Sequence, residues 1–307
     1  PEGRRPRRLH AVKDFVAWLM GARWRAIVLA ALLGLVSWLQ PFSGGVVALV
    51  ALRLGWLEGA VVAAGASLLA LLAGWLSGVG PVFALSPLLG VWLPALALAL
   101  VLRRSHSLAL MIQVATGVAI AGLAAYYIIV DEPVAPVQAW LQANLVPLMT
   151  RIGGEAAVPS ADRLEAMARL TPGMLAAGMI LFATLAVLIG RWWQAALANP
   201  GGFRHDFHRL TNGRVATLAA SVLFVGALLT SNLWLDNAAL ALLVMFMYQG
   251  LAVLHGVIGM RRMHRGWLVA VYSLMVLVPL QLVSVAAIVG LLDNWLHFRR
   301  LVAANVK

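Results

Sequence analysis

The most polar stretch of this chain, residues 191–210, reads RWWQAALANPGGFRHDFHRL and places two histidines beside an aspartate. Imidazole and carboxylate groups are ligands for zinc or iron, so His205, Asp206 and His208 are the first candidates for chemistry. No further ligand lies close to them in the sequence, and Arg204 and Arg209 bring positive charge to the same segment. The pattern therefore predicts no metal, no cofactor and no catalytic residue here.

The same segment is better explained as an anchored turn. Its Pro-Gly-Gly is typical of a turn, and a single Gly-Gly pair is a weak signal for a phosphate loop. Paired tryptophans and an arginine at the end of an apolar run favour the lipid headgroup region, while Phe203, Phe207 and Leu210 share one helical face. We expect a cytoplasmic docking or coupling loop, with plain interface anchoring as the alternative. Its contact residues would be Arg191, Trp192, Trp193, Asn199, Gly201, Gly202, Phe203 and Phe207.

The composition predicts which structural elements position this loop. The chain is 63% hydrophobic and only 11% charged, which leaves too few polar side chains to cover a soluble domain. Its apolar residues form runs near the ~20 residues that a helix needs to cross a bilayer. Strands of a membrane barrel would alternate polar and apolar residues, and these runs do not. We expect an all-α integral membrane protein, a polytopic helical bundle in the bacterial inner membrane.

The charge and the cysteine content limit which partners and covalent bonds the chain can have. The net charge of +12 is spread over the ends of apolar runs, so it indicates membrane topology and lipid contact rather than nucleic acid. The chain has no cysteine, which excludes disulfides and thiolate sites. The basic N-terminal segment leads directly into the first apolar run with no small-residue cleavage site, so no cleavable signal peptide is expected.

The hydropathy pattern predicts eight or nine membrane segments, with the second one in doubt. They cover residues 24–40, 46–56, 59–78, 82–102, 107–130, 173–196, 214–231, 237–259 and 267–292. Lysine and arginine remain on the cytoplasmic side of short loops, so the N-terminus is expected in the cytoplasm. An odd number of spans then sends the basic tail outside. Either 46–56 spans half the membrane, or the last segment bends at Pro279, or the tail is an exception.

This pattern divides the chain into five regions. Residues 131–172 are expected to hold two short amphipathic helices outside the cytoplasm, one with Val137, Trp140, Leu141, Leu145 and Leu148 on a face and one with Leu164, Met167 and Leu170. The regions are a basic cytoplasmic N-terminus (1–23), an N-terminal bundle (24–130), the amphipathic connector (131–172), a C-terminal bundle with a cytoplasmic loop at 197–213 (173–295), and a basic tail (296–307).

Small residues recur at intervals of four in the first span, at Ala22, Ala26, Ala30 and Gly34. Such faces let helices approach closely in lipid, either within the bundle or against a partner protein. Together with LGWLEGAVVA at residues 54–63, this order of features resembles the substrate-binding S components of energy-coupling-factor transporters. The resemblance covers residues 24–80. It implies an S-component-like N-terminal half in which Ala26, Ala30 and Gly34 face a coupling subunit.

The opening segment carries a second resemblance. Arg191 to Gln194, Asn199 to Phe203, and Asp206-Phe207 resemble the signature of a family of uncharacterised bacterial membrane proteins related to the YybS protein. That family is described as a domain of unknown function and is distantly similar to the S components. The resemblance implies a family and a transport-related setting, but no activity.

Polar residues inside apolar runs are the remaining candidates, because they are costly to bury without partners. Gln113, Tyr248, Gln249 and Gln281 are the predicted ligand contacts, with helix-to-helix hydrogen bonding as the alternative role; His255 is expected to reach the cytoplasmic surface. No paired carboxylates or catalytic triad pattern occurs, so an enzyme is not expected. The sequence favours a small-molecule-binding or transport-related subunit that couples to a partner protein through cytoplasmic loops. The alternative is a non-transporting accessory subunit of a larger membrane complex.

Overall fold

A computed structural model describes residues 7–78, 80–264 and 266–304 of the chain. The chain is 88% helical, and the described ranges contain no strand, which confirms the all-α expectation. It packs as two compact units: unit 1 is Pro1–Ala115 with Leu181–Thr211, and unit 2 is Thr116–Ile180 with Asn212–Lys307. Residues 1–6 of the predicted basic N-terminus and residues 305–307 of the predicted tail lie outside the described residues.

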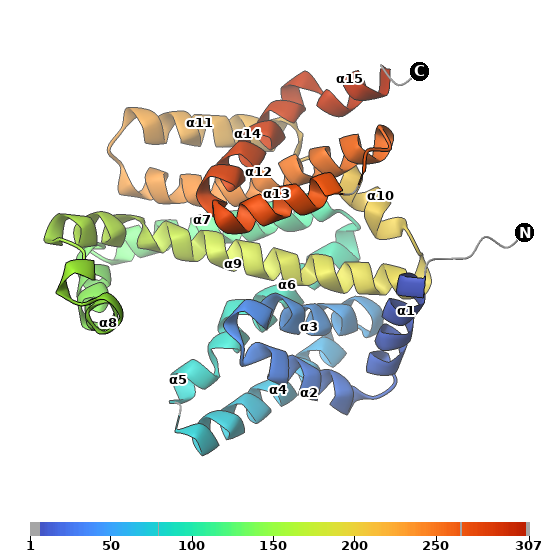
Figure 1. The fold of residues 1–307 in the computed structure, drawn as a ribbon, viewed down its shortest axis with the longest axis horizontal. Coiled ribbons are helices and arrows are strands. Elements are labelled where there is room, and N and C mark those ends of the chain that lie inside the picture. Colours follow the sequence, from blue (N-terminus) through green and yellow to red (C-terminus); the bar gives the residue numbers. More distant parts are fainter. Residues whose placement is uncertain (1–6, 79, 265, 305–307) are drawn as a thin grey trace, which may run out of the picture. The chain divides into compact units, whose positions relative to one another are not determined.

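Unit 1 is built around one buried helix (Figure 1). The helix α3 (Gln40–Leu54) packs against α2 (Arg23–Gly34), α4 (Trp56–Ser77) and α6 (Leu93–Ser105). Every residue from Ser43 to Leu52 is buried, which is typical of a helix that is apolar on all sides. The remaining elements of the unit are α1 (Arg7–Met20), η1 (Ser37–Leu39), α5 (Pro81–Ala84), the π-helical turn η2 (Leu88–Trp92) and α10 (Gly202–His208), with parts of α7 (Leu108–Ile129) and α9 (Ala161–Ala198).

Small residues allow the close packing of α3 against the second half of α9. A Cβ atom on Gly45 would lie 2.9 Å from the side chain of Ile189, and one on Gly190 would lie 2.9 Å from the Cβ of Ala48. A larger side chain at these glycines has no space, so the two helices can approach only because the sequence is small at both sides of the contact.

Unit 2 consists of α8 (Ala135–Gly153), η3 (Glu155–Ala157), α11 (Gly213–Leu229), α12 (Leu233–Met260), α13 (Gly266–Leu277), α14 (Pro279–Leu296) and α15 (Phe298–Ala304), with the remaining parts of α7 and α9. Its centre is α12, whose residues are mostly buried and which packs closely on α14. A Cβ atom on Gly250 would collide with the carbonyl group of Ala286, and one on Gly290 with the carbonyl group of Phe246. The backbones of α12 and α14 are therefore in direct contact at these two glycines.

The predicted connector at 131–172 contains the two expected helices, α8 and the start of α9. They pair with each other through a small core in which Leu141, Leu164 and Ala168 are buried. The partly buried Val137 and Leu145 belong to the same core, whereas Trp140 is 60% exposed. The predicted apolar faces are therefore covered only in part, since Leu148, Met167 and Leu170 are each more than 40% exposed.

Six described helices are long and apolar enough to cross a membrane, or up to eight if each of two bent helix pairs counts as one span. The expected upper count of nine is therefore not reached. The first predicted span, 24–40, ends as a helix at Gly34. At its other end, between Met20 and Arg23, α1 and α2 meet at 111°. The last predicted span, 267–292, is two helices that separate at Val278, because Pro279 cannot donate the hydrogen bond that would continue α13. The break corresponds to the alternative in which the last segment bends at Pro279.

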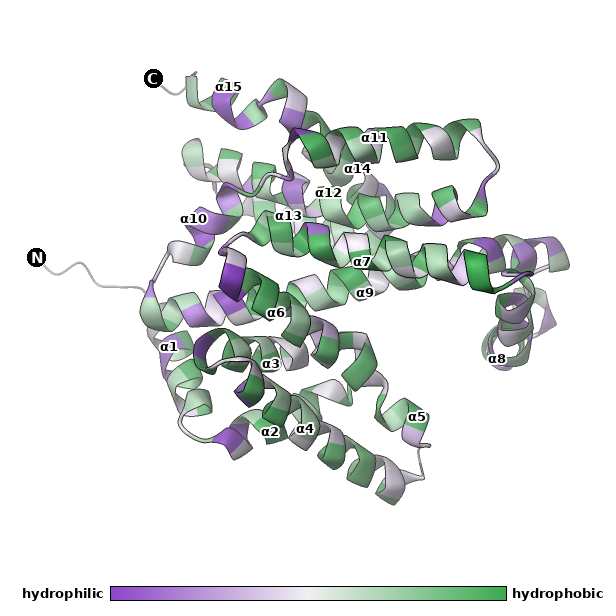
Figure 2. Ribbon diagram, turned by 180° about the vertical axis from the view of Figure 1, so that it is seen from behind, coloured by the Kyte–Doolittle hydropathy of each residue, from purple (hydrophilic) through white to green (hydrophobic). Residues whose placement is uncertain are grey.

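Hydropathy follows these elements. In Figure 2, hydrophobic residues run along α7 and α11, whereas hydrophilic residues gather on α8, α10 and α15. Many large apolar side chains are exposed on the long helices, including Val118, Leu218 and Leu228. Because monomeric soluble proteins rarely expose such extended apolar surface, the protein is a multi-pass membrane protein whose exposed helix faces contact lipid.

Candidate functional site

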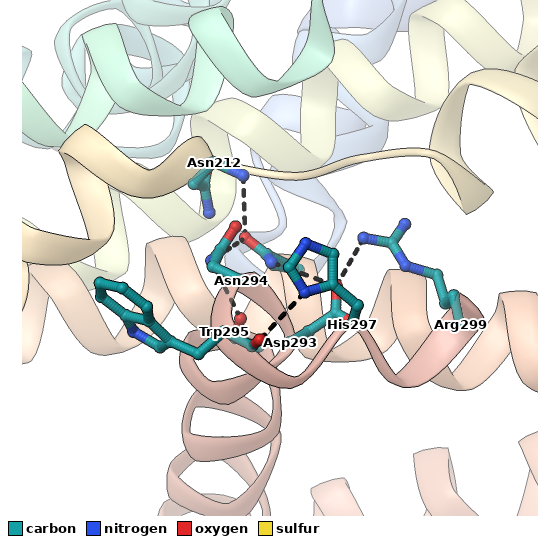
Figure 3. Close-up of polar contacts among 8 residues, drawn as sticks. Asn212, Asp293, Asn294, Trp295, His297 and Arg299 are labelled. Atoms are coloured by element: carbon teal, nitrogen blue, oxygen red, sulfur yellow. Dashed lines mark hydrogen bonds and ion pairs between the residues drawn. The ribbon is translucent and has the colours of Figure 1, made fainter. Parts of the chain in front are cut away.

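A cluster of polar side chains that includes Asn212, Asp293 and Asn294 lies inside unit 2 (Figure 3). Its central residue is Gln249 of α12, which is fully buried. The Oε1 atom of Gln249 accepts hydrogen bonds from the backbone N–H of Asn212 at 2.8 Å and from Nδ2 of Asn294 at 3.2 Å. Its Nε2 atom donates to Oδ2 of Asp293 over a longer distance of 3.5 Å. Gln249, which was predicted to contact a ligand, thus bonds to neighbouring helices, as in the alternative role of helix-to-helix hydrogen bonding.

The charged part of the cluster arises where α14 ends. His297 has a φ of 53°, in the left-handed region, and this turn ends α14 and returns the chain toward it as α15. As a result, Nη2 of Arg299 lies 2.6 Å from Oδ2 of Asp293 (Figure 3). Asp293 sits in the last turn of α14, where the negative end of the helix dipole disfavours an anion, so the arginine compensates for both the burial and the dipole.

This cluster connects four elements of unit 2 and offers little to a ligand. Asn212 precedes α11, Gln249 lies in α12, Asp293 and Asn294 lie in α14, and Arg299 lies in α15. The aspartate and arginine neutralise each other. Among the described residues, Oδ1 of Asp293 is one of the buried oxygens of the cluster that have no hydrogen-bond partner. The arrangement is suited to holding the helices together.

A second buried amide, Asn237 of α12, repairs a break in α9. Pro172 interrupts the hydrogen bonding of α9, and the N–H of Gly173 donates to Oδ1 of Asn237 at 2.5 Å in place of the carbonyl of Arg169. That carbonyl accepts instead from Nδ2 of Asn237 at 2.9 Å, and the same Nδ2 atom lies 2.9 Å from the hydroxyl of Tyr127. The side chain of Asn237 therefore replaces one backbone hydrogen bond with two.

Unit 1 contains a pocket large enough for a small molecule. It has a volume of about 520 Å³, within the range of roughly 300–1,000 Å³ that is usual for ligand sites. One face of α4, at Ala70, Ala73, Gly74 and Ser77, forms one wall. The end of α2, the start of α3, and the segment from α5 to the start of η2 complete the lining.

The pocket exists because the helices differ in length. At 1.5 Å per residue, the 12 residues of α2 span about 18 Å and the 22 residues of α4 span about 33 Å. The small-residue face of α4 is buried at Ala63, Ala66 and Ala70, where α2 and α3 pack beside it. Beyond Gly34, where α2 ends, no helix of equal length covers that face, and the hollow remains.

Beside Gly34, the ring of Trp92 is fixed by a short chain of hydrogen bonds. Nε1 of the fully buried Trp92 donates to Oγ of Ser43 at 2.7 Å, and this hydroxyl donates to the carbonyl of Ala30 at 2.6 Å. A Cβ atom on Gly34 would lie 2.7 Å from the Trp92 ring. Gly34, predicted as a coupling residue, therefore lines the pocket and contacts the indole.

The polar segment 191–210 packs within unit 1. Nη2 of Arg191 lies 2.8 Å from Oδ2 of Asp206, which ties α9 to the short helix α10. Phe207 and Trp193 are buried, and Phe203 stacks on Phe207 with ring centroids 5.8 Å apart. The apolar face that was predicted to dock a partner is thus largely covered within the unit. Trp192 remains 41% exposed.

The turn residues of this segment have local roles. Gly201 has a φ of 95°, which favours glycine, and begins α10. A Cβ on Gly202 would meet the side chain of Asn199 at 2.5 Å, so these residues form a compact stop after α9. Among the described residues, no group of three or more His, Cys, Asp or Glu side chains is placed to hold a metal ion.

The other predicted contacts do not form one site. Ala26 and Ala30 are buried inside unit 1, where they pack within the bundle. In unit 2, Gln281 is exposed near the start of α14, 12 residues or about 18 Å of helix before Asp293. Tyr248 is buried beside Gln249, and Gln113 is half-buried in α7 of unit 1. Within neither unit do these residues line the described pocket.

Sequence reasoning missed Asp293, Arg299 and the pocket itself. Asp293 directly follows the last predicted span, 267–292, and was not singled out. A signal for the pocket was present in the small residues spaced by three and four along residues 70–77.

Comparison with known proteins adds no family to this description: no protein-family model, curated protein or solved structure matches the chain. The resemblances to the YybS-related family and to the S components therefore stay predictions. Fold and site define the class, an all-α multi-pass membrane protein with an open pocket in unit 1 and a buried polar cluster in unit 2.

Proposed function

We propose that the protein binds a small molecule in the unit 1 pocket and serves as a transport-related subunit of a bacterial inner membrane. The observation that supports this proposal is the pocket itself, which combines a ligand-sized volume with polar groups at a helix-lined recess. Most contacts of the buried cluster in unit 2 are made among its own members, so it is the weaker candidate for a binding site.

The distribution of charge supports an extracytoplasmic opening. On α2, α3 and α6 the basic residues lie at the helix ends remote from the pocket: Arg23 at the start of α2, Arg53 in the last turn of α3, and Arg103 and Arg104 in the last turn of α6. Residues 34–40 and 80–92 at the pocket end carry no charged side chain. Under the positive-inside rule the basic ends face the cytoplasm, and the pocket opens on the other side.

The test is to identify what the protein retains. The tagged chain is extracted from its native membrane in mild detergent, and bound small molecules are released and identified by mass spectrometry. Ala73→Trp places a large ring in the pocket, whereas Leu72→Trp places it on the exposed side of the same helix. We expect one small molecule with the wild type and the Leu72 variant and none with the Ala73 variant. An empty wild type, or retention by Ala73→Trp, contradicts the proposal.

The alternative, an accessory subunit held by a partner through α10, has less support. Phe207 is buried in unit 1, so the contact would fall on the exposed Arg204, His205 and Arg209. In the same extraction, recovery of a membrane assembly with no small molecule would favour it.

A further inference from the structure

We infer that the unit 1 pocket takes an uncharged molecule that presents hydroxyl or N–H donors on one side and apolar surface on the other. This inference names the ligand class of the proposed function and rests on it.

The pocket has an uncharged lining. None of the described residues that line the pocket carries a formal charge. An isolated charge moved into a partly desolvated recess needs a counter-ion or several strong hydrogen bonds, and otherwise the loss of hydration opposes binding. A carboxylate, phosphate or ammonium ligand would find no counter-charge in this lining. The lining therefore selects against ions of either sign.

Two serine hydroxyls of the pocket already donate their hydrogens to the backbone. The hydroxyl of Ser77 donates to the carbonyl of Ala73 at 2.7 Å, and the hydroxyl of Ser86 donates to the carbonyl of Phe83 at 2.8 Å. A serine hydroxyl has one hydrogen and two lone pairs, so both oxygens can only accept from a ligand. A matching ligand must bring O–H or N–H groups to them.

The remaining polar groups complete this pattern. Within the described part of the chain, the side chains of Ser37 and Gln40 make no hydrogen bond, and Gln40 is half-buried at the start of α3. An amide can both donate and accept, so Gln40 can fix the orientation of a ligand that the serines hold. Ala70 and Ala84 are buried and Leu35 lies at the rim, and these apolar surfaces suit a non-polar part of the same molecule.

The experiment uses the absence of cysteine, because each introduced thiol is then the only one in the chain. Ser77→Cys and, separately, Ser86→Cys are purified and reacted with four methanethiosulfonates of similar size: hydroxyethyl, propyl, aminoethyl and sulfonatoethyl. Each rate is divided by the rate at Ser231→Cys, an exposed serine in the turn before α12. This ratio removes the intrinsic reactivity of each reagent.

Ser77 and Ser86 are themselves exposed to solvent, so desolvation at the two positions is partial. We expect the aminoethyl and sulfonatoethyl reagents to be slowed there by about threefold or more relative to the hydroxyethyl reagent. Equal slowing of the positive aminoethyl and the negative sulfonatoethyl reagent would indicate desolvation, because a local electrostatic potential would slow one reagent and accelerate the other. A charged reagent that keeps its control rate would overturn the uncharged class, and a propyl reagent as fast as the hydroxyethyl one would overturn the need for donors. In both cases retention of a molecule by the wild-type protein, but not by Ala73→Trp, would still stand. If no reagent reacts at either pocket position, the pocket is closed and the proposed function fails with the inference.

Discussion

Removing Arg299 should destabilise the protein more than neutralising its partner Asp293. Asp293 is 4% exposed, Arg299 lies 2.6 Å from its Oδ2 atom, and the amide of Gln249 is 3.5 Å away. Arg299→Ala leaves a buried carboxylate without a cation, which costs about 3–5 kcal/mol. Asp293→Asn leaves an arginine that is 19% exposed and can turn its head group toward water or lipid phosphate, which costs about 1–2 kcal/mol.

The difference in unfolding free energy between these two variants tests whether the carboxylate is the group that needs a partner. The two single variants should differ by about 2 kcal/mol, or roughly 30-fold in the folding equilibrium. The double variant Arg299→Ala with Asp293→Asn should regain most of this difference, because the uncompensated charge is gone. Arg169→Ala is the matched control, since the Arg169–Glu165 pair of α9 is more than half exposed on both sides and contributes about 0–1 kcal/mol.

The assay is reversible unfolding of the purified protein in mixed detergent and dodecyl sulfate micelles, followed by tryptophan fluorescence and helical circular dichroism. An Arg299→Ala effect no larger than that of Arg169→Ala would refute a buried ion pair. An Asp293→Asn effect larger than that of Arg299→Ala would show that the arginine, and not the carboxylate, is the group that needs compensation.

Three further predictions concern helix packing and the opening segment. Gly250→Ala should abolish monodisperse folded protein in size-exclusion chromatography because its Cβ collides with the backbone of α14, whereas Gly178→Ala has open space and should be tolerated. Asn237→Ala should cost about 2–4 kcal/mol in the same unfolding assay by leaving an N–H and a carbonyl of α9 unsatisfied, and an effect below about 1 kcal/mol would contradict that role. Arg191→Ala should release α10, so that limited trypsin digestion after Arg204 becomes faster; unchanged cleavage would show that the ion pair does not hold α10.

Some of the architecture follows from local sequence. Runs of about 20 apolar residues have one common solution in lipid, since only a helix satisfies every backbone group within its own segment. The amphipathic spacing in residues 131–172 likewise predicted two helices, and Leu141 and Leu164 lie on the buried faces. Such features depend on neighbours three or four positions away, which the sequence displays directly.

Segment ends were harder to predict than segment existence. Hydropathy remains high across Gly34 and across Val278, so it does not reveal that α2 stops after 12 residues or that α13 and α14 separate. The nine-span expectation exceeded the observed range for this reason. A 15-residue helix such as α3 is too short for a lone span, and it is accommodated because the helices around it cover it on all sides.

By itself, the sequence determined that this is a helical multi-pass membrane protein, because composition and periodicity are properties of short stretches. Only the tertiary structure decided which polar groups are buried together and where a hollow remains. Asp293 and Arg299 meet because the chain turns at His297. Gln249 accepts hydrogen bonds from Asn212 and Asn294, which belong to two other parts of the chain. The pocket lies where α4 extends beyond the end of α2. Each of these depends on the lengths and relative positions of helices far apart in the chain, and residue types alone do not encode such distances.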